Sequence, residues 1–273
     1  MCWITRVCNL PPQIWCVFMT SIQLSVTIIT YNEEKNIERC INSVKEVADE
    51  VLVVDSFSTD KTKEICKRLG VNFIERSFTG YSDQKNYATE QAKFNHILSL
   101  DADEALSSEL HSSIQNAKRN WEYDAYRFNR LTNYCGSWIR HSGWYPDTKL
   151  RLWDRRKGKW EGTHLHESIQ LEDEASTKKL RGDLLHYSYY SVEQHMQQMN
   201  TFTTKASQEY LAKGKKVIPI WHLGLYPPLA FLNRYILKLG FLDGASGLMV
   251  CKSTAYYKFL KYAKLRQLLQ NNQ

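Results

Sequence analysis

Two carboxylates stand two residues apart in this chain, at Asp101 and Asp103, directly after the apolar run 96–100. Carboxylate oxygens are the ligands that Mg²⁺ and Mn²⁺ prefer, and Mg²⁺ usually leaves coordination positions open for the phosphates of a substrate. An isolated pair of acids at this spacing is more often an exposed acidic turn. The position of this pair at the end of a predicted buried strand nevertheless favours a metal site.

Polar residues also close two other apolar runs. Residues 24–30 and 50–55 are rich in β-branched and aliphatic side chains, as buried strands are, and they lead into Thr30-Tyr31-Asn32 and Asp55-Ser56. In doubly wound α/β sheets, ligands bind beyond the carboxyl ends of the strands. We therefore expect all three polar clusters at one edge of a sheet, where they form a single candidate site.

Two common phosphate-binding motifs are missing from the sequence. No GxGxxG follows the first predicted strand, and neither GxxxxGKS nor GxxxxGKT occurs. Both absences argue against a dinucleotide-dependent dehydrogenase and a P-loop NTPase. A first turn poor in glycine, together with an acid pair, fits a protein that holds a diphosphate through a metal.

The elements that position these side chains alternate along the first half of the chain. Strands are predicted at 24–30, 50–55, 71–74 and 96–100. Helices are predicted after the caps Asn32, Thr59 and Ser82, with Gly70 ending the second helix, and over 106–119. This alternation predicts a doubly wound α/β sheet. Further strands are expected at 126–134, 149–153, 160–166 and 180–187, and helices from Ser191 onward.

Composition and charge narrow the class of protein. The 273 residues are 43% hydrophobic and 24% charged, which excludes wholesale disorder, and no apolar run reaches the ~18 residues of a spanning helix. From Thr201 onward there are eleven Lys and Arg but two acids, so this tail carries +9 and the rest −2. Such a tail indicates an anionic partner (phospholipid, phosphorylated glycan or nucleic acid) or a solvated helical face. Seven cysteines without CxxC pairs indicate reduced thiols.

Several motifs together resemble family 2 glycosyltransferases, which have the GT-A fold. The four that carry this resemblance are Val26-Thr-Ile-Ile-Thr-Tyr-Asn-Glu-Glu34, Val53-Val-Asp-Ser-Phe-Ser-Thr-Asp-Lys-Thr62, Gln84-Lys-Asn86 and Leu100-Asp-Ala-Asp-Glu104. Three later ones resemble the branch that builds the inner core of lipopolysaccharide, whose members add β-1,4-linked glucose to the first heptose: Gly143-Trp-Tyr-Pro-Asp147, Lys149-Leu-Arg-Leu152, and Trp160-Glu-Gly162 leading to His166-Glu167.

The resemblance implies a division of the chain. Residues 24–125 would form the GT-A α/β part that binds a nucleotide sugar, and 126–190 a β-rich part that binds the acceptor and carries catalysis. Residues 191–273 would form a basic helical tail, and 1–23 an extension outside the fold. The apolar helical segments of the tail, 227–239 and 256–265, either lie in a membrane interface with Lys toward anionic headgroups or pack on the catalytic part.

The resemblance also implies roles for single residues. Thr30, Tyr31 and Asp55 would contact the uracil or ribose of a UDP-sugar, and Lys85 would lie near the nucleotide. Asp101 would lie near the ribose and the metal, and Asp103 would be the main ligand of Mg²⁺ or Mn²⁺. Many family members have two consecutive acids where this chain has Asp55-Ser56, so this chain departs from the family pattern at the position of the base contact.

Catalysis needs a base for the acceptor hydroxyl, and Glu167 is the candidate. Its alternatives are a surface carboxylate or a partner of Arg151. Three histidines, His164, His166 and His186, could suggest zinc. No recognised motif adds a third ligand to the closely spaced pair His164 and His166, so structural or substrate contacts are favoured. His186 is expected near the diphosphate. Four aromatic residues could stack on a sugar or belong to the core: Trp138, Trp144, Tyr145 and Trp153.

The expected function is therefore a metal-dependent inverting hexosyltransferase. It would move a hexose, expected to be glucose, from a UDP-sugar to a heptose of the lipopolysaccharide inner core. It would act in the cytoplasm, peripherally on the anionic inner face of the inner membrane. The alternatives are a family 2 enzyme for another surface glycan or lipid-linked acceptor, and a basic nucleic-acid-binding protein. The last lacks any recognised motif, and no nucleic acid is expected as a partner.

Overall fold

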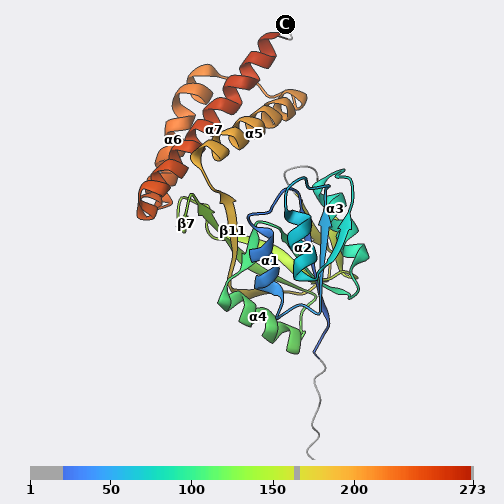
Figure 1. Cartoon of the computed structure of the whole chain (residues 1–273). Helices are drawn as coiled ribbons and strands as arrows, with labels where there is room; N and C mark the ends of the chain where they lie inside the picture. The colour runs from blue at the N-terminus through green and yellow to red at the C-terminus, as the bar shows by residue number, and fades with distance from the viewer. Residues whose placement is uncertain (1–20, 163–166, 272–273) are drawn as a thin grey trace, which may run out of the picture.

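The computed structural model describes residues 21–162 and 167–271, so most of the expected N-terminal extension lies outside the described residues. The α/β part of the molecule is built around one large mixed sheet. Long helices form a separate end of the molecule, beyond β7 (Ser137–Ile139) and β11 (Thr177–Tyr189) (Figure 1). Ile22, which the sequence placed in the extension, already belongs to the fold because its N–H donates to the carbonyl of Lys118 at 3.0 Å and its side chain packs on the core.

The first half is the predicted alternation of strands and helices. Its elements are β1 (Leu24–Thr30), α1 (Ile37–Val44), β2 (Glu50–Asp55), α2 (Thr62–Leu69), β3 (Asn72–Glu75), α3 (Tyr81–Gln91), β4 (His96–Asp101), β5 (Glu104–Leu106) and α4 (Ser108–Arg119). The strands β3-β2-β1-β4 are parallel neighbours in that order. Every residue of β1 is buried, because α1 and α4 on one side and α3 on the other enclose this region. The doubly wound sheet is confirmed.

The second half extends the same sheet. Its remaining strands are β6 (Ala125–Tyr134), β8 (Asp147–Asp154), β9 (Gly158–Glu161) and β10 (Ser168–Leu171). β8 runs antiparallel to β4, and the sheet continues through β6 and β11 to β5, while β9 and β10 form a separate pair. The sequence did not predict β5. Its pairing with β11 sets Glu104 opposite His186, which brings β11 to the end of β4.

The helical end consists of α5 (Val192–Ala212), η1 (Ile220–Leu225), α6 (Tyr226–Leu232), η2 (Asn233–Leu237), η3 (Gly240–Asp243) and α7 (Gly244–Asn271). α7 packs along α5 and α6 (Figure 1). The start of α7 crosses η3 closely, since a Cβ on Gly247 would lie 2.0 Å from the carbonyl oxygen of Gly240. No helix among the described residues combines the length and apolar character needed to cross a membrane.

Three predicted helix caps are wrong, and the first error is informative. Asn32 does not begin α1 but takes a left-handed conformation, with φ of 53°, which asparagine tolerates better than most residues. Its Oδ1 accepts from the N–H of Thr59 at 2.8 Å, and its own N–H donates to Ser58 Oγ at 2.8 Å. Asn32 thus ties the loop after β1 to the loop after β2, the edge where ligands are expected.

The other two caps are displaced by a few residues. Helix α2 begins at Thr62, whose N–H donates to Asp60 Oδ1 at 3.0 Å, and α3 begins at Tyr81, so Ser82 lies inside it. Gly70 ends α2 with a φ of 69°, as predicted. The predicted strand 160–166 corresponds to β9 only in its first residues, and 163–166 lie outside the described residues.

Candidate active site

A cleft of about 650 Å³ lies at the carboxyl ends of β1, β2 and β4, where the sequence predicted a site. Residues from all three strand ends line it, including Thr30, Tyr31, Ser56, Asp101 and Asp103. Side chains from more distant elements complete it: Glu33, Gln84, His186 and Gln198. We call this hollow the main cleft. It joins the predicted Asp101–Asp103 pair to the first polar cluster in one space.

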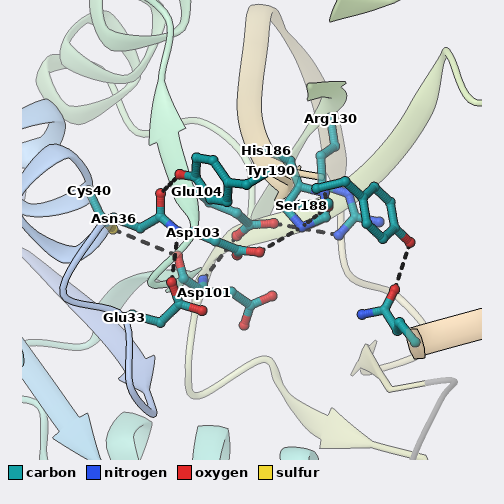
Figure 2. Close-up of polar contacts among 12 residues, drawn as sticks. Glu33, Asn36, Cys40, Asp101, Asp103, Glu104, Arg130, His186, Ser188 and Tyr190 are labelled. Atoms are coloured by element: carbon teal, nitrogen blue, oxygen red, sulfur yellow. Dashed lines mark hydrogen bonds and ion pairs between the residues drawn. The ribbon is translucent and has the colours of Figure 1, made fainter. Parts of the chain in front are cut away.

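Asp103 and His186 lie together in the wall of the main cleft. Their atoms Oδ2 and Nε2 lie 3.2 Å apart, and Figure 2 shows them facing each other above Asp101 and Glu33. The antiparallel pairing of β5 with β11 produces this contact, because it places His186 beside the turn that carries Asp103. His186 was expected near the diphosphate, and the structure places it at the acid pair.

The donor atoms of Asp103 and His186 suit a divalent cation whose remaining coordination positions are filled by a bound substrate. Asp103 Oδ2 and His186 Nε2 lie 3.2 Å apart, so both could contact one divalent cation, for which a carboxylate oxygen and an imidazole nitrogen are suitable donors. The described residues contain no group of three or more His, Cys, Asp or Glu suited to hold a metal. Asp103 and His186 would therefore supply two ligands, with substrate phosphates taking further positions.

Asp101 has a different environment from Asp103. Its Oδ1 lies 3.0 Å from Lys85 Nζ, and its Oδ2 accepts from Arg151 Nη2 at 2.9 Å. Burial opposes ionisation of Asp101, but the charges of Lys85 and Arg151 outweigh burial and hold its pKa well below the usual range. Both oxygens of Asp101 are thus paired with cations, so Asp103 is the carboxylate of the pair that is better placed for a metal.

Lys85 links the main cleft to Glu167. This lysine is 1% exposed, and its Nζ lies 3.3 Å from Glu167 Oε1 as well as 4.5 Å from the centre of the Trp160 ring. Glu167 therefore pairs with Lys85, not with Arg151 as one alternative held. Glu167 lines a second cavity of about 400 Å³, and Asp101 lines both this cavity and the main cleft. The second cavity is also lined by Arg127, Arg130, Lys149, Arg151 and Trp160.

The residues expected at the nucleotide are only partly brought together. Thr30 lines the main cleft, and its Oγ1 is buried without a hydrogen-bond partner among the described residues. Tyr31 is 58% exposed at the rim. Asp55 is buried behind the cleft, where Oδ2 accepts from the N–H of Ser58 at 2.7 Å and Oδ1 from its hydroxyl. Ser56 lines the cleft in its place, and a nucleotide contact for Asp55 stays a prediction.

Sequence reasoning missed Glu33 and Gln198. Glu33 accepts from Asn36 Nδ2 at 2.7 Å, and Tyr190 in turn donates to Asn36, as Figure 2 shows. Burial raises the pKa of Glu33 to about 7, with smaller contributions from nearby acids including Asp103. Its position after the first predicted strand could have identified it. Gln198 comes from α5, and nothing in the sequence connects that helix to the cleft.

The structure gives different outcomes for the remaining aromatic and histidine candidates. Trp153 is fully buried and packs on Trp160 with ring centres 6.1 Å apart, so its proposed stacking on a sugar is wrong. Trp144 packs on Tyr134 but also lines a hollow beside His186. His164 and His166 lie outside the described residues.

The architecture is a GT-A-like α/β fold with a mixed central sheet and long C-terminal helices. A mannosyltransferase from Pyrobaculum calidifontis, solved in complex with GDP-Man and Mn²⁺, has the same fold, with a TM-score of 0.50 and 15% identity over 91% of this chain and 88% of that one. The family described as Glycosyl transferase family 2 matches residues 25–170.

Curated relatives extend the match over nearly the whole chain. An uncharacterized glycosyltransferase of Rickettsia typhi is 33% identical over 257 residues, covering 90% of this chain and 87% of its own. The lipopolysaccharide core biosynthesis glycosyltransferase LpsC of Rhizobium meliloti is 28% identical over 253 residues, covering 90% and 93%. The chain belongs to glycosyl transferase family 2, and it is a glycosyltransferase.

Proposed function

We propose that the protein transfers a hexose, glucose in the first instance, from a UDP-sugar to a heptose of the lipopolysaccharide inner core, with inversion at the anomeric carbon. The observation that carries this proposal is the Asp103–His186 pair in a cleft at the carboxyl ends of β1, β2 and β4. The similarity to LpsC supports the choice of acceptor. Residues 24–125 would hold the donor, and 126–190 the acceptor.

The donor would lie in the main cleft with its diphosphate toward Asp103. Thr30 and Tyr31 would contact the nucleoside, while Lys85 and Arg151 hold Asp101 in place. Asp103 and His186 would hold Mg²⁺ or Mn²⁺, which when bound offsets negative charge on a departing diphosphate.

Glu167 would activate the acceptor from the second cavity. The acceptor hydroxyl gives its proton to the Glu167 carboxylate as its oxygen forms a bond to the anomeric carbon. The bond from that carbon to the UDP oxygen breaks, and its electron pair leaves with UDP. A single displacement turns an α-linked donor into a β-linked product. Lys85, 3.3 Å from Glu167, fixes the carboxylate beside the main cleft.

A donor screen tests the proposal directly. The protein is incubated with UDP-glucose, UDP-galactose, UDP-N-acetylglucosamine or GDP-mannose, with Mg²⁺ or Mn²⁺, in the presence of deep-core lipopolysaccharide acceptor. We expect nucleotide release above background with a UDP-hexose, lost on adding a chelator, and a product with β configuration by NMR. Turnover of GDP-mannose alone would contradict the UDP assignment, and retention of configuration would contradict the single displacement.

The helical end supports a membrane as the second partner. Large apolar side chains are exposed along η1, α6, η2 and η3, with Ile220 78% and Leu237 73% exposed. The others in this apolar face are Ile218, Trp221, Leu225, Leu229, Leu232, Ile236, Leu239, Phe241 and Leu242. So many exposed large apolar side chains within residues 218–242 are typical of a binding surface. The tail helices α5, α6 and α7 pack mainly on one another, while these apolar side chains stay exposed, which supports the membrane alternative.

The charge around the apolar face suits an anionic lipid surface. Residues 213–273 contain a single acid, Asp243, and its carboxylate is paired with His141, whose Nδ1 lies 2.9 Å from Oδ1. Lys215, Lys216 and Lys238 are exposed beside the apolar face. Interfacial helices bury apolar residues near the headgroups while Lys and Arg contact anionic lipid. We propose that this end docks on the cytoplasmic face of the inner membrane, where the lipid-linked acceptor lies.

Replacing Ile220 and Leu237 together by Ser is expected to weaken partitioning onto phosphatidylglycerol-containing vesicles by about 10- to 100-fold, because two inserted aliphatic side chains are lost. Sedimentation with vesicles measures this, and Phe57→Ser, at an exposed site on the α/β half, is the control. If the wild type and the double variant bound only to neutral vesicles, this result would contradict the role of charge. A concentration-dependent dimer that the double variant abolishes, without vesicle binding, would overturn the membrane assignment.

A further inference from the structure

The second cavity carries an excess of cations that the proposed transfer does not use. Four basic side chains line it, Arg127, Arg130, Lys149 and Arg151, against two carboxylates, Asp101 and Glu167. Both carboxylates already share the buried ammonium of Lys85, at 3.0 and 3.3 Å. Counting Lys85 and the two further carboxylates that pair with this lining, Glu104 and Asp147, five cations stand against four carboxylates, and the remaining positive charge favours an anion over a neutral sugar.

Part of the hydrogen-bonding capacity of these cations is unused among the described residues. Arg151 is 4% exposed, and while its Nη2 pairs with Asp101 and Glu104, its Nε and Nη1 have no hydrogen-bond partner among the described residues. Buried donors without a partner are costly. Arg127 lines the cavity, is exposed, and makes no ion pair within residues 21–162 and 167–271.

The other two cations are anchored at one side of the cavity. Arg130 Nη2 lies 2.8 Å and Lys149 Nζ 3.0 Å from the carboxylate of Asp147, one on each oxygen. Asp147 therefore holds both cations at the cavity, and Arg130 is also paired with Glu104, whose Oε1 lies 3.6 Å from its Nη1. A second anion can bind between them and Arg127, and guanidinium groups bind phosphate oxygens with short, charge-assisted hydrogen bonds.

We propose that the second cavity is the acceptor subsite and that it recognises a phosphate substituent on the acceptor saccharide. This inference rests on the proposed function, because Glu167 lines the same cavity and would act on a hydroxyl of the sugar bound there. Arg127, Lys149 and the free nitrogens of Arg151 bind the phosphate. The phosphate thereby orients the saccharide, with one hydroxyl toward Glu167 and toward the main cleft.

Inorganic phosphate is the first probe, with UDP and Mg²⁺ at saturation so that the main cleft is filled. At constant ionic strength, phosphate is expected to raise the melting temperature of the wild type. The double variant Arg127→Ala/Lys149→Ala should bind phosphate about 10-fold more weakly or worse. Lys159→Ala/Arg181→Ala removes two exposed cations outside the cavity and should keep the full shift. Equal loss in both double variants, or no shift in the wild type, would overturn the subsite.

The acceptor is the second probe. Core oligosaccharide is compared with the same material after chemical removal of its phosphates. For the wild type, kcat/KM should fall about 10-fold or more on the stripped acceptor, whereas the Arg127→Ala/Lys149→Ala variant should treat both acceptors alike. Equal use of both acceptors by the wild type would refute phosphate recognition while leaving the transferase function intact. Phosphate binding without transfer to any core acceptor would instead refute the proposed function and leave an anion site.

Discussion

Asp103→Asn is expected to lower turnover of the UDP-sugar by about 100- to 1,000-fold, because several kcal/mol of electrostatic stabilisation of the departing diphosphate would be lost with the cation. Asn keeps the size of the side chain and one oxygen but removes the negative charge. His186, 3.2 Å away in the wild type, cannot replace that charge. The loss should therefore appear in kcat at saturating donor and in the affinity for the metal.

Two measurements separate this role from a structural one. UDP release is followed across a Mn²⁺ titration, and Mn²⁺ binding in the presence of UDP is followed by electron paramagnetic resonance. Asp173→Asn removes an exposed carboxylate outside the main cleft and should leave both unchanged. Near-normal turnover of Asp103→Asn, with ordinary Mn²⁺ affinity, would show that the metal assignment is wrong.

Asp101 is a poorer position for such a test. Its carboxylate is shared by Lys85 and Arg151, which are 1% and 4% exposed. Removing one partner of a buried ion pair commonly costs about 3–5 kcal/mol of stability, since the remaining charges stay buried and unpaired. A change at Asp101 would therefore mix loss of folding with loss of metal binding, whereas the ion pair of Asp103 among the described residues is with His186 and not with a buried lysine or arginine.

Local pattern was enough to predict the sheet and the edge that carries the site. The aliphatic runs that became β1, β2 and β4 are short, buried and closed by polar residues, and strand ends of a parallel sheet must meet at one edge. Helix starts were less predictable. Asn32 has the side chain of a helix cap, but here it bonds across to the neighbouring loop, a tertiary contact that no local rule contains.

The contacts that complete the site come from pairing over long distances in sequence. His186 reaches Asp103 only because β5 pairs with β11, and β5 is three residues long, too short for a periodic signal. Lys85 reaches Glu167 because α3 lies beside β9, and a buried lysine runs against the usual location of that residue. Spacing could name these residues as candidates, but only the fold brings them into contact.

Glu167→Gln is expected to reduce transfer by about 100- to 10,000-fold, because the amide cannot accept the proton of the acceptor hydroxyl. The substitution preserves the shape of the side chain, and Lys85 keeps its contact to Asp101 at 3.0 Å, so the fold should be retained. Glu167 lines the second cavity and not the main cleft. Affinity for UDP with Mg²⁺ should therefore stay within about twofold of the wild type, while kcat falls.

The matched control for this change is Glu161→Gln, which neutralises a nearby exposed carboxylate paired with Lys159 at 3.3 Å. Initial rates of UDP release with core acceptor, together with calorimetric titration of UDP and Mg²⁺, separate proton transfer from donor binding. A base predicts loss of kcat alone. Parallel loss of UDP affinity and kcat would place Glu167 at the donor instead, because a residue that only receives the acceptor proton does not contribute to binding the nucleotide.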